Sequence, residues 1–125
     1  MSDFIEKKER LILIRKFGMI GTLKSDHVET YRKLHEDTVH EEKWRGVLDM
    51  IRDCHIKNYS IFIEENIVFS YFEYDGDHFE EDMKKMEQDP ITQEWWKLTH
   101  PCFCMVNHDY DTEMEQIFDL SDDKL

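Results

Sequence analysis

Apolar residues alternate with polar or small residues along some short stretches of the chain and recur at helical spacing along others. A period of two begins at Lys16 and predicts a first strand. The residues of its two faces are Phe17, Met19, Gly21 and Leu23 on one side and Gly18, Ile20 and Thr22 on the other. Because a strand of this kind presents apolar side chains on at least one face, we expect it to lie in a sheet covered by other elements.

Helical spacing follows the first strand. Ser25 is a candidate N-cap, and Asp26 suits the positive end of the helix dipole. The apolar face of this first helix carries Val28, Tyr31, Leu34 and His35. A second helix is predicted over residues 41–54, with Trp44, Val47, Leu48 and Ile51 on one face.

Two β-rich runs then flank a short polar turn. Residues 58–63 and 67–72 are rich in isoleucine and aromatic residues, and Glu64-Glu65-Asn66 separates them. This pattern predicts a β-hairpin. In the second run, Val68, Phe72 and Tyr74 fall on one parity and Ile67, Phe69 and Tyr71 on the other.

The last third of the chain predicts one more helix and one more strand. Asp77 and Glu80 have the spacing of a capping box. The helix after them would bury Phe79, Met83 and Met86 and stop at Pro90. Residues 105–112 are polar and are predicted as a loop, and residues 115–120 as the last strand.

The order strand, helices, hairpin, helix, strand indicates an α+β fold. Helices on one face of a four-stranded antiparallel sheet give the ferredoxin-like split βαβ arrangement. Apolar residues at both parities of the strands indicate that the second sheet face is buried too, most simply by a second copy of the chain. We therefore expect a homodimer.

Composition and charge narrow the partners. The chain has 125 residues, enough for one domain, and its formal net charge of -13 argues against nucleic acid or an anionic membrane as a partner. A neutral substrate fits this charge best. Apolar runs fall short of the roughly 20 residues that span a bilayer, and the first ten residues carry no signal-peptide pattern.

Cysteine usage and local composition suggest a compartment and domain limits. The three cysteines, Cys54, Cys102 and Cys104, are an odd number, two of them separated by one residue, which predicts reduced thiols and a cytoplasmic protein. We expect residues 1–14 to form an N-terminal arm, residues 15–120 the domain and residues 121–125 a C-terminal tail.

Two adjacent tryptophans, Trp95 and Trp96, lie between Pro90 and Pro101. Neighbouring residues on a helix point about 100° apart, so both indoles cannot be centred on one buried stripe. At least one is therefore expected to line a cavity or an interface. Indole faces pack well on the C–H face of a sugar ring, and the indole N–H can donate to a hydroxyl.

Tyr31 and His35 are four residues apart and thus neighbours on one helix surface. Histidine titrates near neutral pH and can both donate and accept a proton. The ordinary alternative is a half-buried histidine whose ring is satisfied by a backbone carbonyl. Tyr59 is in phase with Ile61 and Ile63 on its strand, and its ordinary alternative is cross-strand packing.

Two further sequence patterns support only weaker hypotheses about function. Cys102-Phe103-Cys104, with His100 and His108 nearby, has zinc-binding residue types, but its one-residue spacing departs from that of structural zinc sites. We predict no metal. The acidic run from Asp109 to Glu115 is interpreted as a solvated loop.

Several segments resemble the L-rhamnose mutarotase family. They are Arg15-Lys16-Phe17-Gly18-Met19, the Tyr31-x-x-x-His35 pair, Lys57-Asn58-Tyr59-Ser60-Ile61-Phe62, Asp89-Pro90 through Trp95-Trp96-Lys97, and Glu115-Gln116-Ile117-Phe118. The resemblance implies a small dimeric α/β barrel, an isomerase that interconverts the α and β anomers of a 6-deoxy sugar without a cofactor. L-Rhamnose is the first candidate sugar and L-fucose the second.

The resemblance also assigns residues. It implies that His35 is the catalytic proton donor and that Tyr31, Tyr59, Trp95 and Trp96 contact the sugar. One departure concerns the stretch between His35 and Trp44: residues 36–43 make it longer than the family's, Arg45 replaces a proline, and His40 competes with His35. We keep His35 because only it has a tyrosine four residues before it.

Two other functions stay open on the sequence. One is a sugar-binding module without catalysis. The other is a cofactor-independent mono-oxygenase or haem-binding protein on the same barrel, because fold alone does not fix function. The sequence does not specify the sugar, the pathway or the role of the arm.

Overall fold

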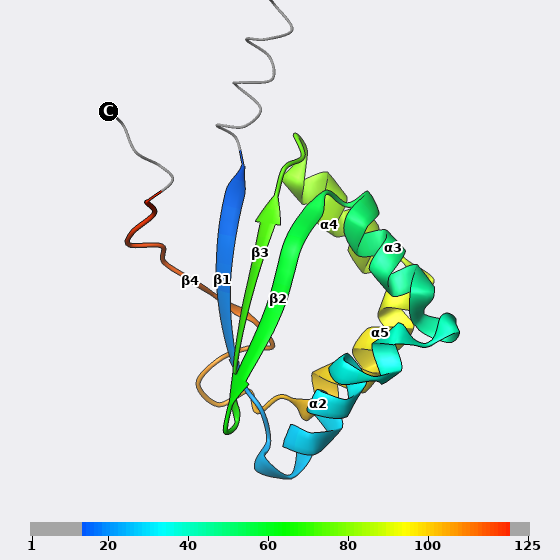
Figure 1. Cartoon of the computed structure of the whole chain (residues 1–125), viewed down its shortest axis with the longest axis vertical. Coiled ribbons are helices and arrows are strands. Elements are labelled where there is room, and N and C mark those ends of the chain that lie inside the picture. The colour runs from blue at the N-terminus through cyan, green and yellow to red at the C-terminus, as the bar shows by residue number, and fades with distance from the viewer. Residues whose placement is uncertain (1–13, 121–125) are drawn as a thin grey trace, which may run out of the picture.

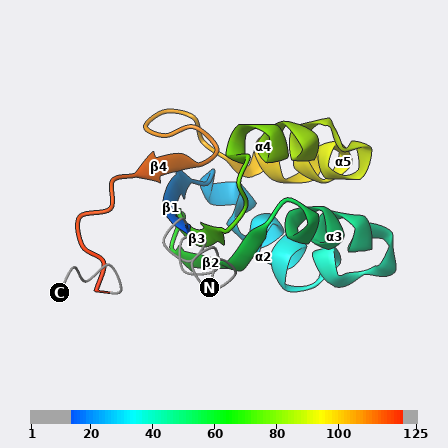
Figure 2. The same ribbon diagram turned by 90° about the horizontal axis from the view of Figure 1, so that it is seen from above.

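A curved four-stranded sheet carries helices on one of its faces (Figure 1). This computed structural model describes residues 14–120, so the predicted arm and tail lie, apart from Ile14, outside the described residues. The elements in chain order are β1 (Arg15–Thr22), α2 (Val28–Glu36), α3 (Arg45–Asp53), β2 (Ile56–Glu64), β3 (Ile67–Tyr74), α4 (Phe79–Gln88), α5 (Pro90–Thr99) and β4 (Thr112–Met114). Seen from above, α4 with α5 and α2 with α3 form two rows beside the sheet (Figure 2).

The sheet has the strand order β2-β3-β1-β4, and every neighbouring pair is antiparallel. Phe17 pairs with Phe72 in the centre, and Phe62 pairs with Phe69 in the hairpin. The predicted hairpin and the ferredoxin-like α+β fold are confirmed.

The last strand is the clearest error of the sequence analysis. We predicted it over residues 115–120, whereas β4 is Thr112–Met114 and pairs with Gly18, Met19 and Ile20. Residues 115–120 form no strand, and Ile117 is 89% exposed. The apolar side chains of residues 115–120 are not buried by the described part of the chain. Apolar composition alone therefore predicted the strand in the wrong place.

Helix starts were also predicted imperfectly. Ser25 does not cap α2, because it opens the 3-10 turn Ser25–His27 that leads into the helix, and α3 begins at Arg45 after two further 3-10 turns. In these turns, backbone carbonyl oxygens accept hydrogen bonds from the backbone N–H groups just before the helix. For example, Trp44 N donates to Glu41 O at 2.9 Å. The predicted capping box before α4 does not form either, because no side chain caps that helix.

Asp89 instead caps α5, and its carboxylate accepts from the backbone N–H of Thr92 at 3.0 Å. Pro90 occupies the first turn of this helix, where a missing N–H costs nothing. The proline thus separates α4 from α5, and the double-tryptophan segment lies on α5.

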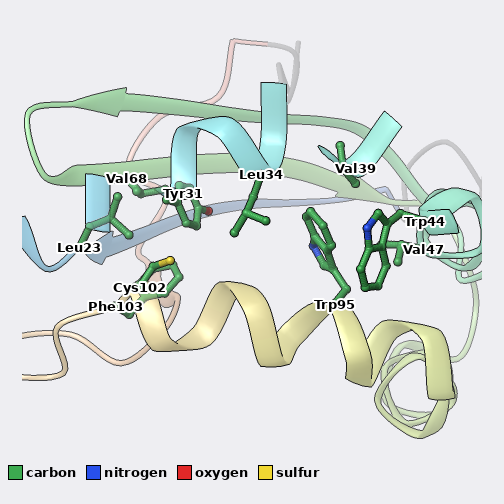
Figure 3. Close-up of a cluster of buried hydrophobic side chains, with 10 residues drawn as sticks. All are labelled: Leu23, Tyr31, Leu34, Val39, Trp44, Val47, Val68, Trp95, Cys102 and Phe103. Carbon is green, nitrogen blue, oxygen red and sulfur yellow. The ribbon is translucent and has the colours of Figure 1, made fainter. Parts of the chain in front are cut away.

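Two hydrophobic clusters lie between the sheet and the helices. One joins β1, β2 and β3 to α4 through Phe17, Ile56 and Tyr74, with Phe79, Met83 and Met86 packed against them. The other joins α2, α3 and α5 to the sheet and contains Tyr31, Trp44 and Trp95 (Figure 3). The predicted faces of α2 and α4 are therefore the buried ones.

The opposite sheet face carries apolar residues that the described part of the chain leaves open. Phe62 is 60% exposed, Phe69 38% and Met114 43%. Strand register puts Phe62 and Phe69 opposite each other on this face, and their ring centroids are 6.1 Å apart.

Candidate active site

The first helix after β1 brings Tyr31 and His35 together as predicted. Their ring centroids are 4.2 Å apart, and His35 Nδ1 lies 2.9 Å from the backbone carbonyl oxygen of Tyr31. A carbonyl only accepts, so Nδ1 carries the proton and donates it. The lone pair of Nε2 is then the free basic group of His35.

Burial sets the charge of this imidazole. It lowers the pKa of His35 below the usual value, and the weaker opposing effect is the hydrogen bond to the Tyr31 carbonyl. The ring is therefore neutral at pH 7. A neutral ring whose Nδ1 proton is already engaged is a proton acceptor at Nε2.

A β-bulge directs Tyr59 to the helix side of the sheet. The pairing of β2 with β3 shifts between Lys57 and Ser60, and Asn58 has a φ of 52°. Tyr59 consequently points to the same side as Ile61, with its ring 5.8 Å from that of Phe72. Bulges often redirect side chains beside functional sites.

The phenols of Tyr31 and Tyr59 are close enough for their charges to interact. Burial is the main cause that raises the pKa of each, and the presence of the other phenol raises that of Tyr31 further. Both hydroxyls therefore stay protonated and can donate hydrogen bonds. Tyr59 is also 43% exposed. Its side chain is therefore open to solvent even though protein atoms surround it, as expected in a concave site.

The two tryptophans occupy different environments. Trp95 is only 5% exposed, and it packs edge-on against His35 at 5.7 Å. It also packs edge-on against Trp44 at 5.1 Å (Figure 3). Trp96 stacks on His100, which stacks in turn on Tyr110. These three residues line a cavity of about 560 Å³ whose lining does not include His35.

The longer stretch between His35 and Trp44 folds into the 3-10 turns Thr38–His40 and Glu42–Trp44. They bury Val39 and leave His40 exposed. Trp44, which ends the second of these turns, packs against Trp95 with ring centroids 5.1 Å apart. The structure thus brings His35, rather than His40, against Tyr31 and Trp95.

The cysteine–histidine pattern is dispersed by the fold. Cys102 is buried and its thiol donates to the Leu98 carbonyl, His100 lies in the aromatic stack, and His108 lies 3.2 Å from the Thr22 hydroxyl. Within residues 14–120, no group of three or more histidine, cysteine or acidic side chains is arranged to hold a metal ion.

One residue of the site was missed by the sequence analysis. Asp111 lies close enough to Tyr31 and Tyr59 for its charge to raise the pKa of both phenols. It belongs to the acidic run that we interpreted as a solvated loop, and no sequence signal separates it from its acidic neighbours. Only the position of β4 places it beside the site.

The fold and the site define a class: small ferredoxin-like α+β proteins with a histidine and tyrosines between the sheet and the helices. The family model for L-rhamnose mutarotase matches residues 16–120. The chain belongs to the L-rhamnose mutarotase family, and this family makes it an isomerase that interconverts anomers.

Relatives and a solved structure agree with this assignment. An L-rhamnose mutarotase of Oceanobacillus iheyensis is 28% identical over 86% of this chain and 99% of its own length. One of Bacillus subtilis is 27% identical with the same coverage. The crystal structure of an L-rhamnose mutarotase from Formosa agariphila superposes with a TM-score of 0.63 at 20% identity, covers 85% of this chain and 98% of that one, and shows the same fold.

No helix within the described range, residues 14–120, has the length and apolar character to cross a membrane.

Proposed function

We propose that this protein interconverts the α and β anomers of L-rhamnose, with His35 as the group that carries the proton. The observation that supports this most directly is the state of His35: a half-buried neutral imidazole whose Nδ1 is held by the Tyr31 carbonyl. Such a ring is oriented to take a proton at Nε2 and to return it later. The family relatives bear the name of this reaction.

Mutarotation requires the sugar ring to open and close. His35 removes the proton from the anomeric hydroxyl, the bond between the anomeric carbon and the ring oxygen breaks, and an acid protonates the ring oxygen. The freed aldehyde rotates, and the reverse steps yield the other anomer. General acid–base assistance typically contributes about 10²–10⁴-fold to such steps.

The tyrosines and tryptophans position the sugar in this proposal. The Tyr31 or Tyr59 hydroxyl donates to a sugar oxygen, which holds or polarises it. Trp95 packs edge-on against the imidazole of His35 and offers an apolar edge to the sugar ring. Trp96 extends the aromatic surface toward His100.

Saturation-exchange NMR on equilibrated sugars tests the proposal. We expect the purified protein to accelerate exchange between the two anomeric signals of L-rhamnose, and the same experiment on L-fucose measures selectivity. Binding of L-rhamnose without faster exchange would instead indicate a sugar-binding module. Neither binding nor exchange, together with a haem absorption band on titration, would favour the haem-binding alternative.

We also infer that two copies of the chain associate through the open sheet face. Phe62, Phe69 and Met114 form an apolar surface there, and exposed patches larger than a few hundred Å² are uncommon on monomers. A two-fold axis would place this face against its own copy. Exposed Ile117 and Phe118, beyond β4, would add to the contact.

The net charge of -13 per chain opposes this association, most strongly at low salt. A dimer held by apolar contact should therefore persist at high salt. Light scattering at micromolar concentration measures this, and a monomer with native circular dichroism would contradict it.

A further inference from the structure

Asp111 immediately precedes β4 at the edge of the sheet, and the register of β4 indicates on which side of the sheet it lies. Glu113 pairs with Met19 and Thr112 with Ile20. Asp111 is the next residue, just outside the paired strand, and the alternation continued by one residue sets it beside Gly21. Residues of β1 alternate, and Phe17, Met19 and Gly21 face the helices. Asp111 thus falls on the helix side, the side of His35.

Gly21 allows the chain around Asp111 to approach the sheet. A Cβ at this position would lie 2.5 Å from the carbonyl oxygen of Tyr110 and 2.6 Å from the Phe103 ring. Only a residue without a side chain fits there. The backbone before Asp111 therefore packs directly on the helix-facing surface of β1.

Asp111 is accessible to solvent and yet has many protein atoms around its carboxyl. The residue is exposed, yet burial among protein atoms raises the pKa of its carboxyl to about 6. Burial likewise lowers the pKa of His35. Both shifts favour uncharged forms, which are a carboxylic acid and a neutral imidazole, and these two forms are a proton donor and a proton acceptor.

The titratable groups facing Asp111 from other elements are the phenols of Tyr31 on α2 and Tyr59 on β2. His35 lies one turn beyond Tyr31, and Glu113 follows on the same strand side. The residues of β1 and β3 that face this side near it, Met19, Gly21, Val68 and Ser70, do not titrate. Desolvation is the cause that shifts the carboxyl, and no cation contributes to it.

We propose that Asp111 is the second proton-transfer residue of this site, the general acid that protonates the ring oxygen of the sugar while His35 removes the anomeric proton. This rests on the proposed mutarotase function and completes its chemistry. The phenols alone are poor acids for this step, because a phenolate beside a carboxylate is unfavourable.

Ring opening transfers two protons and breaks one bond of the sugar ring. The anomeric O–H proton moves to His35 Nε2, and its bonding electrons form the aldehyde C=O. The bond from the anomeric carbon to the ring oxygen breaks, its electron pair stays on that oxygen, and the Asp111 carboxyl supplies the proton. After rotation, the Asp111 carboxylate takes the proton back as the ring closes, and His35 returns its own, so no group is consumed.

This pairing predicts a bell-shaped pH profile of the catalysed exchange. The active form has Asp111 protonated and His35 neutral. Exchange therefore falls as pH rises through the Asp111 pKa of about 6, and falls as pH drops through that of His35.

The test measures L-rhamnose anomer exchange by saturation-exchange NMR from pH 4.5 to 8.5, after subtraction of the uncatalysed rate. The proteins are the wild type, Asp111→Asn, Asp111→Glu and the control Asp109→Asn, an exposed residue of the same loop. We expect Asp111→Asn to lose about 10²-fold in rate and to lose the alkaline fall, because an amide supplies no proton. Asp111→Glu should retain the fall at a shifted pH, and Asp109→Asn should match the wild type.

The possible results separate the role of Asp111 from the mutarotase function itself. A wild type that exchanges the sugar and an Asp111→Asn variant with the same rate and profile would overturn the role of Asp111 and leave the mutarotase function standing. A variant that is slower by one factor at every pH, with the alkaline fall intact, would also overturn the acid role. A wild type without any exchange would overturn both.

Carboxyl-carbon NMR keeps the test independent of variant folding. Titration of the Asp111 carboxyl in the wild type should coincide with the alkaline fall of the exchange rate. An Asp111 carboxyl that titrates near its ordinary value, while the fall lies near pH 6, would contradict the assignment.

Discussion

The two faces of the sheet are built by the same strands and yet differ in almost every property. On β3, Val68 and Tyr74 face the helices and are each 1% exposed, whereas Phe69 faces the other way and is 38% exposed. Strand composition does not distinguish the two parities. What distinguishes them is that the chain places its own helices on one face and leaves the other uncovered by the described residues.

The polar groups of the two faces differ as well. On the open face they satisfy one another: Tyr71 donates to Glu73 at 2.7 Å, Asn58 donates to the same carboxylate, and Lys16 pairs with Asp119. On the helix face, Tyr31 and Tyr59 keep hydroxyls whose ionisation burial opposes. Polar groups that pair with each other serve structure, whereas groups held neutral by burial are available to a substrate.

The largest expected effect is on the helix face. Trp95→Ala removes a buried indole that packs on both Trp44 and His35, and should lower the free energy of unfolding by about 3–5 kcal/mol. Trp96→Ala, at a half-buried neighbour, should cost clearly less. Urea denaturation measures both. Equal losses would contradict the different environments of the two tryptophans.

On the open face, the expected effect is on assembly. Phe62→Glu puts a charge into the proposed contact and should convert the dimer to a monomer at micromolar concentration, because an unpaired buried charge is strongly disfavoured. Gln88→Glu, on the exposed side of α4, adds the same charge outside that contact and should leave the dimer intact. Analytical ultracentrifugation distinguishes the outcomes, and a Phe62→Glu dimer would place the interface elsewhere.

Replacing one tyrosine by phenylalanine on each face compares the functions of the two faces directly. Tyr59→Phe removes a hydroxyl proposed to hold the sugar and should slow anomer exchange by about 10-fold, the equivalent of one lost hydrogen bond of about 1.5 kcal/mol. Tyr71→Phe loses its bond to Glu73 and should leave exchange unchanged. Exchange that falls in the second variant and not in the first would reverse the roles of the faces.

The smallest expected effect is on stability with pH. Because the pKa of Asp111 is raised to about 6 in the folded protein, its stabilising contribution is complete below the unfolded value near 4 and is lost as pH rises through about 6. Asp111→Asn should therefore gain thermal stability relative to the wild type at pH 7.5, and this gain should disappear by pH 4. Calorimetry measures the difference, with Asp109→Asn as the charge control. A gain that grows toward low pH would contradict it.

Local patterns predicted the fold well where local forces decide it. Alternation gave β1 and the hairpin, and helical spacing gave the buried faces of α2 and α4. The Tyr31–His35 contact follows from their spacing on one helix. The last strand failed because pairing with β1 depends on long-range register, and residues 115–120 are apolar without being paired.

Some site residues could likewise be predicted from local sequence patterns, and others could not. Tyr59 was expected on the side of Ile61. The bulge at Asn58 comes before Tyr59, so Tyr59 and Ile61 stay on the same side of the sheet. Asp111 could not be distinguished in its acidic run, because its position depends on β4 and on the space above Gly21. The separation of Trp95 from Trp96 was expected from the 100° turn, although which indole is buried depends on the position of Trp44.

The measurement that tests the account most directly is L-rhamnose anomer exchange by saturation-exchange NMR at pH 7, with the wild type and His35→Asn side by side. We expect exchange well above the uncatalysed rate in the wild type, and a loss of about 10²–10⁴-fold in a His35→Asn variant with unchanged circular dichroism. A folded His35→Asn protein that exchanges the anomers as fast as the wild type would contradict it.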